Sequence, residues 1–298
     1  MKFSLFVCGA ALFVSCAAQP PTDNWSEGSL AIALTLEQQA QQLTAITSQA
    51  FGAANSQHAL AMSACAEIEH LMRGHSLAWR ALFSYATTIE KVLAKSRLDS
   101  KNINAIAQAF NELHSKLLQT NIATHFGVDL NTHRQIISGI QQSSSTRQAL
   151  MVVSLGVAEI CQELAKATTE IVEQLDALNM QLLELQKLDN LALLERNQLL
   201  LARQQRYKSA VDPRYDAEFE MLQVAKEITA NQVAMSEMDR NAEALNKLFL
   251  DNKLLLQQCV SAYYEWGLCS QALTKSSVAV TQDFRLFQER AEVISGYE

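Results

Sequence analysis

The stretch LMVVSLGVAEICQELAKATTEIVEQLDALNMQLLELQKL, residues 150–188, decides the fold that we expect for this chain. Its apolar residues recur every seven positions, and the series continues beyond the stretch itself. The members of the series are Leu150, Val157, Leu164, Ile171, Leu178, Leu185, Ala192 and Leu199. Such a repeat is typical of a helix that packs lengthwise against a partner helix. We therefore expect one helix over residues 146–209, which at ~1.5 Å per residue would be about 95 Å long.

A second seven-residue pattern follows Pro213. One series is Met221, Ile228, Met235, Ala242, Phe249, Leu256 and Tyr263, and its companion is Val224, Asn231, Met238, Leu245, Asn252, Cys259, Trp266, Leu273, Val280, Phe287 and Ile294. The simplest arrangement is an antiparallel coiled-coil hairpin over residues 144–298 with its turn near 209–214. Asn231 and Asn252 would help to fix its register. The alternative is that each helix pairs with another subunit.

The preceding segment, residues 29–143, predicts shorter helices. No strand alternation is found from Glu27 onward, and apolar residues recur at helical spacing in several stretches that are separated by turns. The whole sequence contains only nine glycines and three prolines, so few residues oppose helix formation. The predicted fold class is therefore all-α, with an N-terminal helical bundle packed on the long hairpin.

Residues 1–18 predict a signal peptide. Lys2 supplies the positive charge, and residues 3–14 are an apolar core that is too short to span a bilayer. Residues 19–28 follow with two adjacent prolines, which favour an extended linker. We therefore expect export to the bacterial outer membrane or periplasm, with secretion as the alternative.

The fate of Cys16 distinguishes two forms of the exported protein. The sequence FVSC, residues 13–16, resembles a bacterial lipobox, although Phe13 replaces the usual Leu. This resemblance implies that a diacylglycerol is attached to the Cys16 thiol. Ordinary cleavage after small residues is the alternative, and it leaves no lipid anchor.

Four further cysteines are candidates for disulfide bonds in an oxidising compartment. Cys161 and Cys259 lie equally far from residue 210, so a hairpin that turns there would bring them face to face. Cys65 and Cys269 would remain as a second pair. The alternative is that all four are buried thiols, since free cysteine packs as a small apolar residue.

No motif in the sequence predicts catalysis, a cofactor or a metal site. Glu67 and His70 have the Glu-x-x-His spacing of di-iron bundles, but a second copy of this motif is absent from the sequence. Neither a nucleophile elbow nor a glycine-rich phosphate loop is found. We expect that the protein is not an enzyme.

Three stretches allow a binding or a structural interpretation. Residues 149–158 are strongly apolar, so Leu150, Val153, Leu155 and Val157 are candidates for membrane contact, although a segment this short favours burial in the protein. The basic residues within 202–208 either bind phosphate or stabilise the end of a helix, and we favour the helix end. Tyr263 and Trp266 fall at core spacing, which favours packing over recognition.

The combined expectation is an exported, lipid-anchored envelope protein that acts as a structural or adaptor component. Its partners would be other envelope proteins or further copies of itself, bound through heptad helices, together with the membrane through Cys16. The net charge of −7 argues against nucleic acid as a partner. Two alternatives remain open. The stretches PPTDNW, STRQAL and ELQKLDNLALL resemble minor pilus proteins of type IV secretion, which implies a part of a secretion or conjugation apparatus, and the long helices resemble those of α-helical pore-forming toxins.

Overall fold

The computed structural model describes residues 25–51, 58–94, 100–120, 130–209, 217–274 and 277–296. Within these ranges the chain forms seven helices and no strand, so the all-α prediction is confirmed. The helices are α1 (Trp25–Phe51), α2 (His58–Leu93), α3 (Ser100–Leu118), α4 (Leu130–Gln141), α5 (Thr146–Ser209), α6 (Ala217–Ala272) and α7 (Ser277–Ser295). The predicted signal peptide and Cys16 lie outside the described residues.

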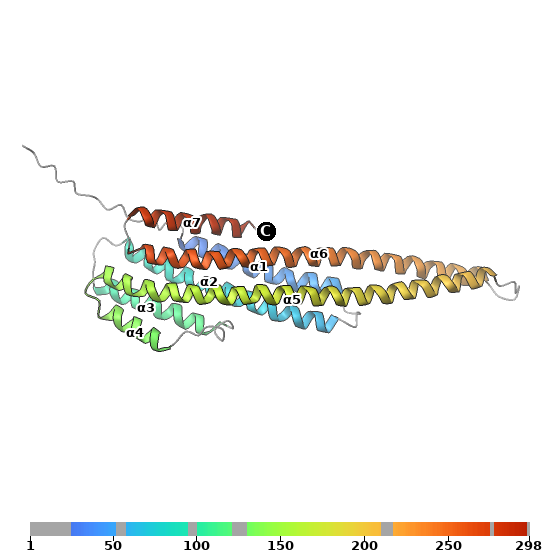
Figure 1. Cartoon of the computed structure of the whole chain (residues 1–298), viewed down its shortest axis with the longest axis horizontal. Helices are drawn as coiled ribbons and strands as arrows, with labels where there is room; N and C mark the ends of the chain where they lie inside the picture. Colours follow the sequence, from blue (N-terminus) through green and yellow to red (C-terminus); the bar gives the residue numbers. More distant parts are fainter. Residues whose placement is uncertain are drawn as a thin grey trace, which may run out of the picture.

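The two longest helices, α5 and α6, run antiparallel along each other (Figure 1). Polar contacts mark this pairing at intervals: Lys253 Nζ lies 2.6 Å from Asp176 Oδ2, and Arg147 near the start of α5 donates to the Thr274 carbonyl just after α6. Apolar side chains fill the interface between these contacts, and Leu164, Ile171 and Leu256 are almost completely buried.

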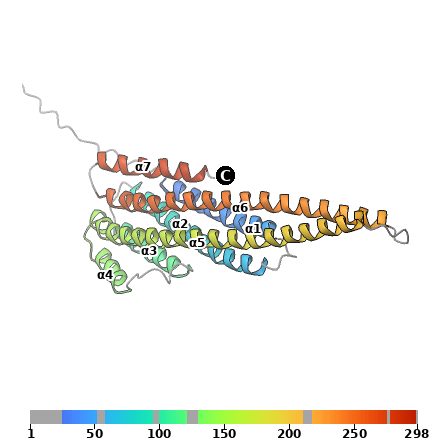
Figure 2. The same cartoon turned by 45° about the vertical axis from the view of Figure 1, so that its right-hand side comes forward.

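Helices α1 and α2 pack against one end of this pair and not against the other (Figures 1 and 2). Near the end of α1, the Gln49 carbonyl accepts a hydrogen bond from Asn241 Nδ2 at 3.4 Å. Past this level only α5 and α6 continue. We call residues 189–209 and 217–240 the arm, and the remaining helices with the rest of α5 and α6 the bundle.

An aromatic cluster forms the centre of the bundle. The Trp25 ring centroid lies 4.5 Å from that of Trp266, and Trp79 stacks on Tyr263 at 4.4 Å. Trp266 Nε1 donates to Ser29 Oγ at 2.9 Å, so the indole nitrogen is satisfied without water. Because Trp266 lies close to the end of α6, these contacts place Trp25 at the end of the molecule remote from the arm.

The prediction of one seam from Met221 to Ile294 is wrong in one respect. Helix α6 ends at Ala272, and α7 folds back to pack on α6 and α1 (Figure 1). Phe284 and Phe287 of α7 are buried beside Trp25 and Trp79. An amphipathic pattern gives the apolar face of a helix but not the direction of the chain, so the two arrangements share the same spacing.

One predicted boundary also differs from the structure. Residues 25–28 of the predicted linker form the first turn of α1, where Trp25 and Ser29 are held in the core.

Candidate functional site

The heptad series of α5 changes its environment along the helix. Leu178 is 6% exposed and faces the bundle, whereas Leu199 is 72% exposed on the arm, and Ala192 is exposed as well. A straight helix drifts by about 20° per heptad from an ideal seven-residue repeat, so a strict series gradually rotates out of the seam. The seven-residue series of α5 therefore continues along the arm on the exposed side of the helix.

The outward-facing residues form a feature that we call the outer stripe, made of Leu188, Leu191, Ala192, Leu199 and Ala202 of α5. All five side chains are exposed, and their spacing of three, four or seven residues places them on one face of the helix, which they share with the exposed Glu195. An exposed apolar face of this kind is typical of a surface that packs against a partner.

The inner seam of the arm is thin and partly polar. Its buried residues include Leu200 and Val224, but also Asn231, whose Nδ2 donates to the Leu193 carbonyl at 2.9 Å. A pair of helices that buries few large apolar side chains has low local stability. The arm is therefore the least stabilised part of the α5–α6 pair.

An apolar groove leads from the bundle to the outer stripe. It lies between the start of α2 and α5, has a volume of about 510 Å³, and is lined by Leu60, Ser63, Glu67, Leu178, Gln181, Leu182, Glu184, Leu185 and Leu188. Leu188 belongs to both the groove and the outer stripe. Glu67 on α2 and Glu184 on α5 are both exposed, so each of the two helices that line the groove adds a carboxylate to its apolar lining.

The basic residues near the tip of the arm occupy the last turns of α5. Arg206 and Lys208 belong to its last turn, and Arg203 interacts with Glu220 of α6 at 3.5 Å and with the Tyr207 ring. Positive charge at this place opposes the negative end of the helix dipole. This position agrees with the helix-end interpretation.

The four cysteines are buried free thiols in the structure. Cys161 faces Gly267, where an added Cβ would lie 3.3 Å from Cys161 Cβ, so Cys259 lies eight residues farther along α6. At ~1.5 Å per residue this separation is about 12 Å, which exceeds the reach of a disulfide. The predicted Cys161–Cys259 pairing therefore does not fit this register.

The register differs because the turn between α5 and α6 lies farther along the chain than predicted. Helix α5 ends at Ser209 and α6 begins at Ala217, so the midpoint is near residue 213 instead of 210. In an antiparallel pair, facing residues have position numbers with a constant sum. Moving the centre of the turn by one residue therefore shifts the residue that faces Cys161 by two positions.

Burial raises the pKa of the Cys161 and Cys259 thiols, which keeps both protonated and unreactive.

The predicted membrane-contact segment is mostly inside the bundle. Leu150, Val153 and Val157 are almost completely buried, and Leu155 is 63% exposed. By length and apolar composition α5 could cross a bilayer, yet 61% of its most apolar window is buried among other helices. The core helix of a soluble bundle passes the same test.

The histidines fall into three environments. His70 and its motif partner Glu67 are exposed on α2, and among the described residues no group of three or more His, Cys, Asp or Glu side chains could hold a metal ion. His75 is buried and lies 3.0 Å from the Tyr263 hydroxyl. His114 and His133, which the sequence separates, stack on each other with ring centroids 3.7 Å apart.

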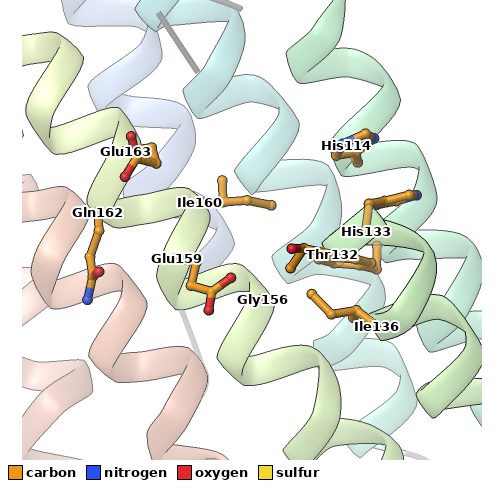
Figure 3. Close-up of a pocket in the computed structure, with 10 residues that line it drawn as sticks. His114, Thr132, His133, Ile136, Gly156, Glu159, Ile160, Gln162 and Glu163 are labelled. Atoms are coloured by element: carbon orange, nitrogen blue, oxygen red, sulfur yellow. The ribbon is translucent and has the colours of Figure 1, made fainter. Parts of the chain in front are cut away.

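These two imidazoles line a pocket of about 190 Å³ between α3, α4 and α5 (Figure 3), the histidine pocket. Its other lining residues are Phe110, Thr132, Ile136, Gly156, Glu159, Ile160, Gln162 and Glu163. Burial lowers the pKa of His114, and burial together with the neighbouring His114 lowers the pKa of His133 to about 4. Both rings are therefore neutral at pH 7.

Sequence reasoning did not bring these residues together, because three helices separated by turns contribute them. One local signal was present: Glu159 and Glu163 are four residues apart and therefore share a face of α5. No protein family model, no curated protein sequence and no solved structure matches this chain.

Proposed function

We propose that the protein is an exported, lipid-anchored envelope adaptor that works by binding and not by catalysis. Its helical bundle serves as the base, and the antiparallel coiled-coil hairpin extends from it as the arm. The observation that carries this proposal is the outer stripe, a heptad surface that faces solvent and joins the apolar groove at Leu188.

The occupant of this surface is an amphipathic helix of another envelope protein. A groove between two helices with five leucines in its lining is suited to the helix-in-groove mode of recognition. Glu67 and Glu184 line the groove, so the favoured helix carries lysine or arginine beside its apolar face. Such a helix would continue along Leu191 and Leu199 and would cover the weak part of the arm.

The position of Trp25 supports an anchored orientation. Trp25 lies at the end of the bundle remote from the arm, and the lipobox-like Cys16 precedes it by nine residues. Helix α5 has 64 residues, which corresponds to about 96 Å at ~1.5 Å per residue. A lipid on Cys16 would hold the bundle near the membrane and direct the arm away from it.

The test compares two lysine substitutions on the same helix. Leu199→Lys places a charge on the outer stripe, and Leu155→Lys places the same charge at an exposed leucine of α5 that lies in the bundle. Each protein is extracted from its native envelope in mild detergent, and the mass of its complex is measured. We expect Leu199→Lys to lose a complex that wild type and Leu155→Lys retain.

Three outcomes would contradict the proposal. Retention of the complex by Leu199→Lys would remove the outer stripe from the interface. Loss of membrane association by Leu155→Lys alone would favour contact of residues 149–158 with lipid, as expected for a toxin subunit. A complex that contains only copies of this chain would replace the proposed partner with self-association.

A further inference from the structure

The histidine pocket has polar atoms that the protein itself leaves without partners, and it is separate from the groove and the arm. His114 is only 5% exposed, and within the described part of the chain its Nε2 has no hydrogen-bond partner. His133 Nε2 lies 3.3 Å from Asn111 Oδ1, an acceptor, so Nε2 carries the proton. His133 Nδ1 is then a buried lone pair, and it too has no partner.

The geometry of the two rings argues against a metal ion as the occupant. Their planes are inclined by 19° and stack at 3.7 Å. Since imidazole lone pairs lie in the ring plane, those of two stacked rings run nearly parallel instead of converging on one point. The occupant must instead supply hydrogen-bond donors to individual acceptors.

The opposite wall of the pocket is acidic. Glu159 extends from α5 toward Thr132 on α4, and Glu163 lies one turn farther along α5 (Figure 3). Glu163 pairs with Lys166, which is a surface contact, whereas Glu159 forms no ion pair with another described residue. Phe110, Ile136 and Ile160 supply apolar surface between the acidic wall and the imidazoles.

We propose that the histidine pocket binds a small primary ammonium compound with a compact apolar or aromatic body. The ammonium group donates to His133 Nδ1, the Glu159 carboxylate on the opposite wall balances its charge, and the body of the ligand contacts Phe110 and Ile160. A volume of about 190 Å³ is sufficient for one ring with a short substituent, since a cavity of ~150 Å³ admits benzene. Neutral imidazoles at pH 7 are compatible with a cationic ligand.

The experiment uses the full chain with benzylamine as the probe and benzyl alcohol as its neutral analogue. Isothermal titration at pH 7 measures binding, and the ¹⁵N shifts of the histidine side chains report on His133 Nδ1. We expect saturable binding of benzylamine in the millimolar range and an upfield shift of the Nδ1 resonance when it accepts a hydrogen bond. Benzyl alcohol should bind about tenfold more weakly or worse, because it cannot form a charge-assisted hydrogen bond.

A matched pair of variants connects the binding to the pocket. Glu159→Gln removes the carboxylate at an exposed position and should weaken benzylamine binding about tenfold. Glu173→Gln makes the same change at an exposed position of α5 outside the pocket and should leave binding unchanged. Equal affinity for benzyl alcohol, unchanged affinity in Glu159→Gln, or no saturable binding would each overturn the proposal. None of these outcomes depends on the adaptor function of the arm.

Discussion

Asn252 shows how a single residue in the seam can oppose stability. It is completely buried, and neither Oδ1 nor Nδ2 of its side chain has a hydrogen-bond partner. A buried polar group without a partner costs about 1–3 kcal/mol. We expect Asn252→Leu, which has a similar volume, to raise the free energy of unfolding by about 1–2 kcal/mol in urea titrations.

Asn231 provides the control because its amide does bond across the seam, to the Leu193 carbonyl. Asn231→Leu loses this hydrogen bond and leaves that carbonyl with only its helical partner. The free energy of unfolding should change less between wild type and Asn231→Leu than between wild type and Asn252→Leu. A loss of stability in Asn252→Leu would show that the amide has a partner, such as water, and would contradict this description of the seam.

Protonation of His133 in the histidine pocket makes the stability of the protein depend on pH. Its pKa is lowered from the ordinary 6.5 to about 4 by burial and by His114, so the unfolded chain binds the proton more readily than the folded chain. Stability is therefore complete above pH 6.5 and falls as the pH decreases toward 4. The loss should be about 1 kcal/mol after allowance for the exposed part of the ring.

His133→Phe retains the ring stacking and removes this titration. The free energy of unfolding, measured by urea at pH 7 and pH 4.5, should differ less between the two pH values in the variant than in wild type. His70→Phe is the control, since His70 is exposed. An identical pH dependence in wild type and His133→Phe would contradict the assigned pKa.

At the scale of elements, α4 is held by two close approaches to α5. A Cβ on Gly156 would overlap Ile136 Cδ1 and lie 3.1 Å from Phe110 Cζ, and a Cβ on Gly139 would lie 3.0 Å from Val152 Cγ1. We expect Gly156→Val to displace α4 and to destabilise the protein by about 1–3 kcal/mol through overpacking. Hydrogen exchange of the amides in 130–141 should become faster, while that of α6 stays unchanged.

Gly296→Ala is the control for this change, since an added Cβ there meets no atom closer than 3.5 Å. Unchanged protection of α4 in Gly156→Val would mean that Ile136 adapts without loss of contact. In that case the histidine pocket would also keep its shape, and benzylamine binding would be unaffected.

The sequence predicted the positions of the helices better than it predicted which helices pack against each other. Seven-residue spacing is a local property. It therefore located α5 and the start of α6 and showed which apolar residues share a helix face. It could not show that Leu199 rotates out of the seam, because the drift accumulates over many turns. It also could not place Phe287 of α7, or His114 beside His133, because these contacts depend on how separate helices pack.

At the scale of the whole molecule, the two ends have different characters. The bundle end holds the aromatic cluster around Trp25 and Trp266, in which both indole rings are completely buried and Trp266 Nε1 donates to Ser29. The arm has a thin seam and an exposed apolar stripe. A rigid base with a weakly stabilised extension is suited to capturing a helix, because the arm gains buried area when the partner binds.

The central claim is that the groove and the outer stripe hold a partner helix, and crosslinking inside the native envelope tests it most directly. A photoreactive residue replaces Leu188, where the groove meets the stripe, and a second protein carries it at the exposed Leu250 of α6 as the control. The crosslinked peptide is then identified by mass spectrometry. We expect one dominant adduct from position 188, on an amphipathic helix with lysine or arginine beside its apolar face, and little from position 250. Absence of an adduct at 188, or the same set of adducts at both positions, would contradict it.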